Sequence, residues 1–84
     1  MLRFVILGSD GLWDYLPSTE AVRIVFQSQT AGLTQDQAAQ RLVERALEIA
    51  AAESGMSVQD LLRLPQGRHR RGRHDDTTAV VMYF

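Results

Sequence analysis

The stretch that decides the fold is FVILGSDGLWD, residues 4–14. Its first four residues are apolar, and they run directly into a polar segment that contains Asp10 and Gly11. A short apolar run that ends at glycine and aspartate is typical of a buried β-strand. The carboxylate that follows such a strand belongs either to a turn or to a metal site. The other end of the chain bears on that choice.

The composition is that of one small globular domain. The chain has 84 residues, of which 45% are hydrophobic and 23% charged. Its formal net charge of −1 gives no reason to expect nucleic acid or an anionic membrane as a partner. The chain contains no cysteine, which excludes disulfides and thiolate metal sites. No apolar stretch approaches the ~20 residues that a membrane-spanning helix needs.

Two apolar runs predict β-strands, one at residues 3–8 and the other at residues 77–84. Neither run alternates cleanly between apolar and polar residues, so we expect both faces of each strand to be covered. Two strands alone form a sheet of marginal stability. The chain therefore has the organisation of a piece of a larger domain.

The sequence after the first strand predicts a helix. Ser18 or Thr19 is expected to cap its first turn. The residues expected on its apolar stripe are Val22, Val25, Phe26 and Gln29.

A second helix is expected between a capping box, formed by Thr34 and Gln37, and a stop at Gly55. A shorter helix should run from Ser57 through Leu62. The core stripe expected on the second helix is Ala39, Leu42, Val43, Ala46 and Ile49, with Glu44, Arg45 and Glu48 outside.

Aspartates stand next to both predicted strands. Asp10 follows the carboxyl end of the first strand, and Asp75 and Asp76 precede the amino end of the last. If the strands are antiparallel neighbours, these ends lie at one edge of the sheet and the carboxylates converge. If the strands are parallel, as a helical crossover more often implies, the carboxylates lie at opposite edges. Periodicity alone leaves both topologies open.

Converging carboxylates repel each other unless a cation lies between them, and a hard divalent ion is the usual solution. Mg²⁺ or Mn²⁺ would suit oxygen ligands, and Gly11 would let the backbone approach the ion. The alternative is turn chemistry. Asp-Gly between apolar segments is typical of a hairpin, with residues 12–16 as the returning strand, and Asp75-Asp76 would form a turn of its own.

Two segments of the chain resemble the metal-dependent protein phosphatase family, type 2C. FVILGSDGLWDYLPSTEAV, residues 4–22, resembles a late motif of that family, in which an apolar strand ends in Asp-Gly before an aliphatic residue, Trp and an acidic residue. GRHRRGRHDDTTAVVMYF, residues 67–84, resembles its C-terminal motif. The double arginine looks most like the pyruvate dehydrogenase phosphatase branch. The resemblance spans essentially all 84 residues.

The resemblance implies an α+β fold, in which this chain is the C-terminal fragment of an α-β-β-α sandwich, with two antiparallel strands joined by a helical insert. Residues 1–84 would then be an incomplete portion of the catalytic domain. The segments that carry the metal-bridging Asp-Gly-His-Gly motif, the first acidic ligand and the phosphate-binding arginine of the family are absent from the chain.

The resemblance also assigns roles to individual residues. Asp10 and Asp75 are implied ligands of one Mg²⁺ or Mn²⁺ in a two-metal site of the complete domain. Residues implied to support these ligands are Gly11, His74 and Asp76, and those implied to be structural are Trp13 and Asp14.

The implied function is hydrolysis of phosphomonoesters on phosphoproteins by metal-activated water. The chain alone should be inactive, because it needs the missing N-terminal part of the same domain. The alternative is a phosphatase-like interaction module without catalysis. The arginines Arg68, Arg70, Arg71 and Arg73 could bind a phosphopeptide or nucleic acid, but short charge runs are usually solvated, so we expect a solvated loop there. We expect His69 to be a loop histidine.

Overall fold

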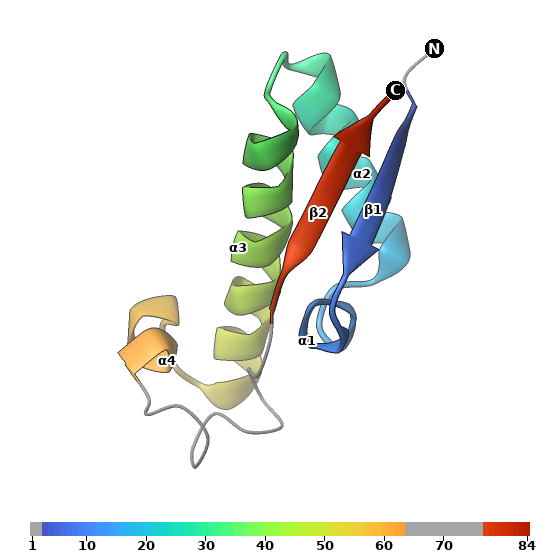
Figure 1. Ribbon diagram of the computed structural model, residues 1–84. Helices are drawn as coiled ribbons and strands as arrows, with labels where there is room; N and C mark the ends of the chain where they lie inside the picture. Colours follow the sequence, from blue (N-terminus) through green and yellow to red (C-terminus); the bar gives the residue numbers. More distant parts are fainter. Residues whose placement is uncertain (1–2, 64–76) are drawn as a thin grey trace.

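The computed structural model describes residues 3–63 and 77–84. Two strands lie side by side and antiparallel, and helices connect them, which confirms the predicted α+β class (Figure 1). In chain order the elements are β1 (Phe4–Gly8), α1 (Asp10–Trp13), α2 (Ser18–Thr30), α3 (Gln35–Ser54), α4 (Val58–Arg63) and β2 (Ala79–Tyr83).

The register of the sheet answers the question of topology. Phe4 lies opposite Tyr83, and Gly8 lies opposite Ala79. The ladder continues beyond β1, because the Ser9 N–H donates to the carbonyl of Thr78 at 3.1 Å. The antiparallel arrangement is therefore confirmed, and the carboxyl end of β1 shares a sheet edge with the amino end of β2.

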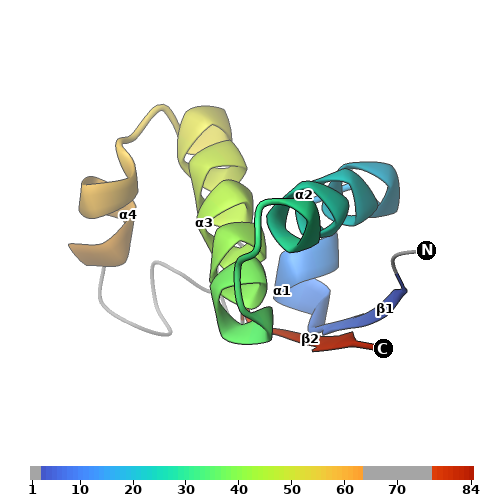
Figure 2. The same ribbon diagram turned by 90° about the horizontal axis from the view of Figure 1, so that it is seen from above.

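The molecule has two layers, a sheet and the helices that cover one face of it. Seen from above, α1, α2 and α3 lie on the same side of the two strands (Figure 2). The strands alternate between partly buried and exposed residues, so their other face is open. Within the described residues the helices cover one face of the sheet only, so this part of the chain does not supply the cover expected for the other face.

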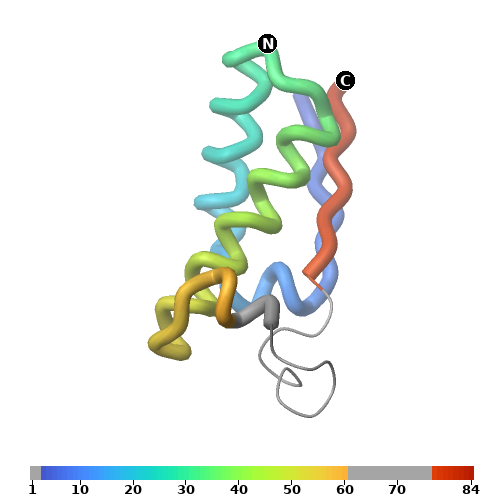
Figure 3. Tube along the Cα trace, turned by 90° about the vertical axis from the view of Figure 1, so that its left-hand side faces the viewer, coloured from blue at the N-terminus to red at the C-terminus, as the bar shows by residue number. Residues whose placement is uncertain are grey.

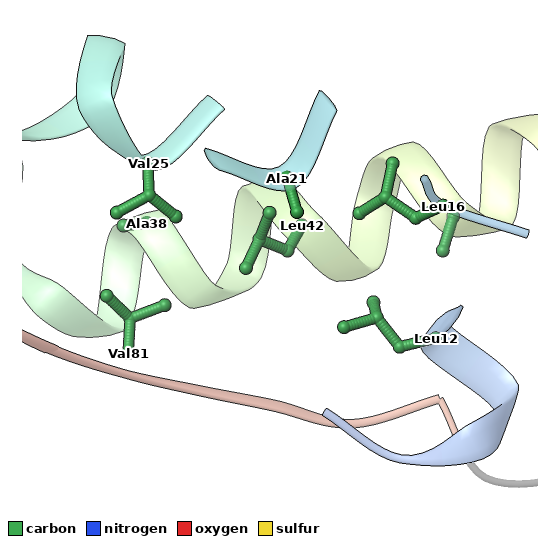
Figure 4. Packing of buried hydrophobic residues seen from close by; sticks show 8 residues of the cluster. Leu12, Leu16, Ala21, Val25, Ala38, Leu42 and Val81 are labelled. Carbon is green, nitrogen blue, oxygen red and sulfur yellow. The ribbon is translucent and has the colours of Figure 1, made fainter. Parts of the chain in front are cut away.

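The core lies between the sheet and helices α2 and α3 (Figure 4). Leu12 and Leu16 enter it from the segment after β1, and Val81 enters it from β2. Its buried residues are Leu12, Leu16, Ala21, Val25, Ala38, Leu42, Ala46 and Val81. The small residues among them let α2 and α3 approach each other closely.

Helix α2 departs from the sequence prediction in two respects. The residue at its N-cap is Pro17, and no side chain caps the helix, so the predicted cap at Ser18 or Thr19 is wrong. Its buried residues are Ala21, Val25 and Ser28, whereas Val22 and Phe26 are exposed. Val25 is buried as predicted, but Ala21 and Ser28 are buried in place of Val22 and Gln29, because α3 packs against the smaller residues of α2.

Helix α3 follows the prediction more closely. The Gln37 N–H donates to Thr34 Oγ1 at 3.1 Å, and the Thr34 N–H donates to Gln37 Oε1 at 2.9 Å, which confirms the capping box. Gly55 ends the helix in the left-handed region, with φ of 69°. Ser57 accepts a hydrogen bond from the Asp60 N–H at the start of α4. On the outer surface of α3, Glu44, Arg45 and Glu48 are exposed, as predicted.

Strand β2 is attached to the start of α3 by side chains. The Tyr83 N–H donates to Gln35 Oε1 at 2.6 Å, and the Tyr83 hydroxyl donates to the carbonyl of Leu33 at 3.1 Å. The Tyr83 N–H points away from β1, because its neighbour Phe84 makes the ladder bond to Arg3. Gln35 thus satisfies a donor on the open edge of β2.

The chain turns from β1 directly into α1 (Figure 3). The indole N–H of Trp13 donates to the carbonyl of Gly8 at 3.1 Å. A Cβ at Gly8 would lie 2.8 Å from Trp13 Nε1 and would also collide with Leu12 Cδ2. The segment after Asp10 is therefore helical, and the alternative of a hairpin with residues 12–16 as its second strand is wrong.

The first prediction concerns this turn. Gly8→Ala should lower the free energy of unfolding by about 1–3 kcal/mol, because the added methyl group overpacks the contact with Leu12 and Trp13. Urea unfolding followed by far-UV circular dichroism measures the change. In a chain that also carries Leu12→Ala, Gly8→Ala should cost less stability, because the smaller side chain at position 12 leaves space for the added methyl group. Equal stability of Gly8→Ala and the parent chain would contradict the prediction.

Candidate functional site

Asp10 lies at the sheet edge that the sequence predicted for it. It is the first residue of α1, directly after β1, and its side chain is exposed. Two hydrogen bonds join its neighbour Ser9 to Thr78, the residue before β2. The Ser9 N–H donates to the carbonyl of Thr78, and the Thr78 N–H donates to Ser9 Oγ, both at 3.1 Å. The residues at the amino end of β2 are therefore held beside Asp10.

The residues that follow Asp10 form the single turn of α1. Gly11 is half-buried, and the Asp14 N–H donates to the carbonyl of Asp10 at 2.8 Å. Trp13 packs against the core and closes the turn through its bond to Gly8. The Asp14 side chain is exposed.

Three of the predicted site residues lie outside the described residues, namely His74, Asp75 and Asp76. The same holds for the arginine-rich segment that contains Arg68, His69, Arg70, Arg71 and Arg73. Their roles stay predictions.

The donor atom that the described residues offer at this edge suits a hard divalent cation. Asp10 offers an exposed carboxylate, and residues 3–63 and 77–84 include neither histidine nor cysteine. Oxygen ligands are the ones that Mg²⁺ and Mn²⁺ prefer. Within these same ranges no three side chains of histidine, cysteine, aspartate or glutamate gather into a group that could hold a metal ion.

A second polar cluster joins α2 to α3 and was not predicted from the sequence. Arg45 Nε lies 2.8 Å from Glu20 Oε2, and Arg45 also pairs with Glu48 at 3.2 Å. The hydrogen bond to Glu20 is the main cause of a raised pKa of Arg45. Glu20 and Arg45 are 25 positions apart, so no local pattern could have revealed the pair.

This cluster borders a shallow groove of about 290 Å³, which Arg41 and Glu44 also line. The arginines and glutamates around it are equal in number, so the groove favours neither anions nor cations. Exposed pairs of this kind each contribute little to stability. We interpret the cluster as a link between two helices and not as a binding site.

The chain is similar in sequence to known proteins. The sequence profile described as Protein phosphatase 2C matches residues 3–55. "Probable protein phosphatase 2C 25" of Oryza sativa subsp. japonica is 44% identical over 82 residues, which is 98% of this chain and 20% of the relative. "Probable protein phosphatase 2C 67" of Arabidopsis thaliana has the same identity and coverage. No solved structure matches the chain.

These matches cover more than half of the chain with one family profile, and the chain belongs to the protein phosphatase 2C family. It spans about one fifth of the length of these curated relatives. The predicted membership of the family is thereby confirmed, while the predicted branch is not tested. In the described part of the chain, the helices are all too short or too polar to cross a membrane.

The second prediction concerns the link between Ser9 and Thr78. Ser9→Ala should speed hydrogen exchange of the Thr78 amide and lower the free energy of unfolding by about 1 kcal/mol, because that N–H loses its acceptor. Exchange measured by NMR checks both effects. Ser57→Ala is the control, since it removes a comparable bond at the start of α4. The prediction fails if both variants change Thr78 exchange equally.

Proposed function

We propose that residues 1–84 are the C-terminal portion of the catalytic domain of a metal-dependent serine/threonine protein phosphatase. The whole protein would hydrolyse phosphomonoesters on phosphoproteins. Membership of the protein phosphatase 2C family supports this, as do relatives whose names describe probable protein phosphatases. The coverage of one fifth of those relatives supports an incomplete domain.

The observation that carries the proposal is the position of Asp10 at the edge where β1 ends and β2 begins. Ser9 and Thr78 are hydrogen-bonded to each other there. Asp75 stands three residues before Thr78 in the sequence, and three residues span at most about 10 Å. Asp75 is therefore our candidate for the second carboxylate at the same edge.

A bound Mg²⁺ or Mn²⁺ would neutralise charge on the phosphoryl oxygens and activate a water for attack on phosphorus. In this proposal the carboxylates of Asp10 and Asp75 hold the cation. Gly11 leaves the backbone beside the ion free of a side chain. Asp76 and His74 orient the ligands, and the turn closed by Trp13 and Asp14 keeps Asp10 at the edge.

The isolated chain would not hydrolyse phosphoproteins. Two carboxylates leave a hard cation mostly hydrated, so its affinity would be weak. Without the segments that bridge two metals and clamp phosphate, neither the second ion nor the substrate is held.

The third prediction tests the ligands on the chain itself. Titration with Mn²⁺ should broaden the NMR signals of Ser9, Asp10, Gly11 and Thr78 more strongly than those of other described residues. Asp10→Asn and Asp75→Asn should each weaken this broadening at least several-fold, because an amide keeps the shape of the carboxylate but loses its charge.

Asp36→Asn is the control, since Asp36 is an exposed acid that has no role in the proposal. Asp14→Asn tests whether the neighbouring acid, which is proposed to be structural, is a ligand instead. Broadening that depends on Asp14 and not on Asp75 would show that the assignment of ligands is wrong.

The fourth prediction tests the activity. The isolated chain should not hydrolyse a phosphoserine peptide in the presence of Mn²⁺. A chimera in which it replaces the matching segment of the rice relative should hydrolyse the peptide, and Asp10→Asn should reduce that activity at least a hundredfold. An intact relative serves as the positive control.

The possible outcomes separate the alternatives. Metal-dependent turnover by the isolated chain would show that the active site is complete within 84 residues. A chimera that folds but stays inactive, beside an active relative, would favour a non-catalytic interaction module.

A further inference from the structure

Ser9 is the residue at which the chain leaves β1 and enters α1, and its backbone and side chain serve different elements (Figure 1). It is the N-cap of α1 and has extended backbone angles. Its carbonyl accepts hydrogen bonds from the N–H groups of Leu12 and Trp13, at 3.0 and 3.2 Å, so it belongs to the first turn of the helix. In a regular antiparallel ladder, that carbonyl would instead accept from the N–H of the residue opposite, Thr78.

The Ser9 hydroxyl takes the place of this carbonyl in the sheet. An N-cap serine ordinarily accepts a hydrogen bond from the second or third N–H of its own helix, but no side chain caps α1. Ser9 Oγ accepts instead from the Thr78 N–H at 3.1 Å, while the Ser9 N–H donates to the Thr78 carbonyl at the same distance. The two bonds of a hydrogen-bonded strand pair are therefore both made, and one acceptor is a side chain.

This change of acceptor fixes the backbone on both sides of Asp10. The Asp10 carbonyl accepts from the Asp14 N–H at 2.8 Å within α1, and the residue before Asp10 is bonded to Thr78. The Asp10 side chain is exposed. Because an aspartate side chain is short, the position of its backbone largely sets the position of its carboxylate oxygens.

We propose that Ser9 is a positioning residue for a divalent cation at this sheet edge. The inference rests on the proposed function, in which Asp10 holds Mg²⁺ or Mn²⁺. Ser9 acts through Asp10 and not as a ligand, because its hydroxyl holds the Asp10 backbone in place before the ion binds and so reduces the ordering that binding requires. Removing a group that orients a metal ligand lowers metal affinity. By thermodynamic linkage, the bound ion also stabilises the bond between Ser9 and Thr78.

Titration of Ser9 variants of the 84-residue chain with Mn²⁺ tests the proposal. The affinity, read from the broadening of the Gly11 NMR signal, should fall about three- to tenfold in Ser9→Ala, as expected for the loss of one hydrogen bond. The side chains in Ser9→Thr and Ser9→Val have the same shape, but only the first has a hydroxyl. Ser9→Thr should restore most of the affinity, whereas Ser9→Val should bind as weakly as Ser9→Ala.

Thr34→Ala is the matched control for a general loss of stability. Thr34 Oγ1 accepts from the Gln37 N–H at 3.1 Å, the same distance as in the bond from Thr78 to Ser9. Thr34 lies near the opposite end of β2, where its carbonyl accepts from the Tyr83 hydroxyl. Thr34→Ala should lower the free energy of unfolding and leave the Mn²⁺ affinity unchanged.

Hydrogen exchange of the parent chain tests the linkage without any variant. Saturating Mg²⁺ at constant ionic strength should slow exchange of the Thr78 amide at least about twofold more than that of the Gln37 amide. Both N–H groups donate to a hydroxyl, but only that of Thr78 lies beside Asp10. Equal slowing of the two amides would reflect general stabilisation and would overturn the proposal.

The outcomes separate this inference from the proposed function. If Asp10→Asn leaves the Mn²⁺ affinity unchanged, Asp10 is not a ligand and both are wrong. If Asp10→Asn lowers the affinity while Ser9→Ala and Ser9→Val bind Mn²⁺ as the parent chain does, Asp10 stays a ligand and the role of Ser9 is overturned. Equal losses of affinity in Thr34→Ala and Ser9→Ala would also overturn that role.

Discussion

The close approach of Leu12 and Trp13 to the backbone of Gly8 is the contact on which the rest of this structure depends. It turns the chain from β1 into α1 with one intervening residue, and the indole N–H satisfies the carbonyl at the end of the strand. It brings Leu12 into the core, where it is fully buried. The same turn leaves Asp10 exposed at the sheet edge. The contact at Gly8 therefore accounts both for the burial of Leu12 in the core and for the position of Asp10 at the sheet edge.

Strand β2 is distant in sequence from β1, and polar contacts near both of its ends hold it in register. Ser9 bonds to Thr78 at one end, and Gln35 bonds to Tyr83 at the other. Between them Val81 packs into the core under α3. Hydrogen bonds therefore hold the two ends of β2, and apolar packing holds its inner face.

The two surfaces that the fold leaves open differ in chemistry. The edge at Asp10 offers carboxylate oxygen to a cation, whereas the sheet face around Leu7, on the side away from the helices, offers apolar side chains. Because the chain spans about one fifth of the relatives' length, we propose that the metal site takes further ligands from the rest of the domain.

The sequence alone determined the features that depend on neighbouring residues, namely the strand that ends at Gly8, the capping box of α3 and the stop at Gly55. It also identified the family, because two motifs stand in order. It could not decide which side of α2 is buried, since Phe26 would suit a core as well as Val25 does. Periodicity could not decide whether the strands are parallel, and only the family resemblance implied that they are antiparallel. Only tertiary packing settled these points, because burial and strand direction depend on contacts between segments that lie far apart in the chain.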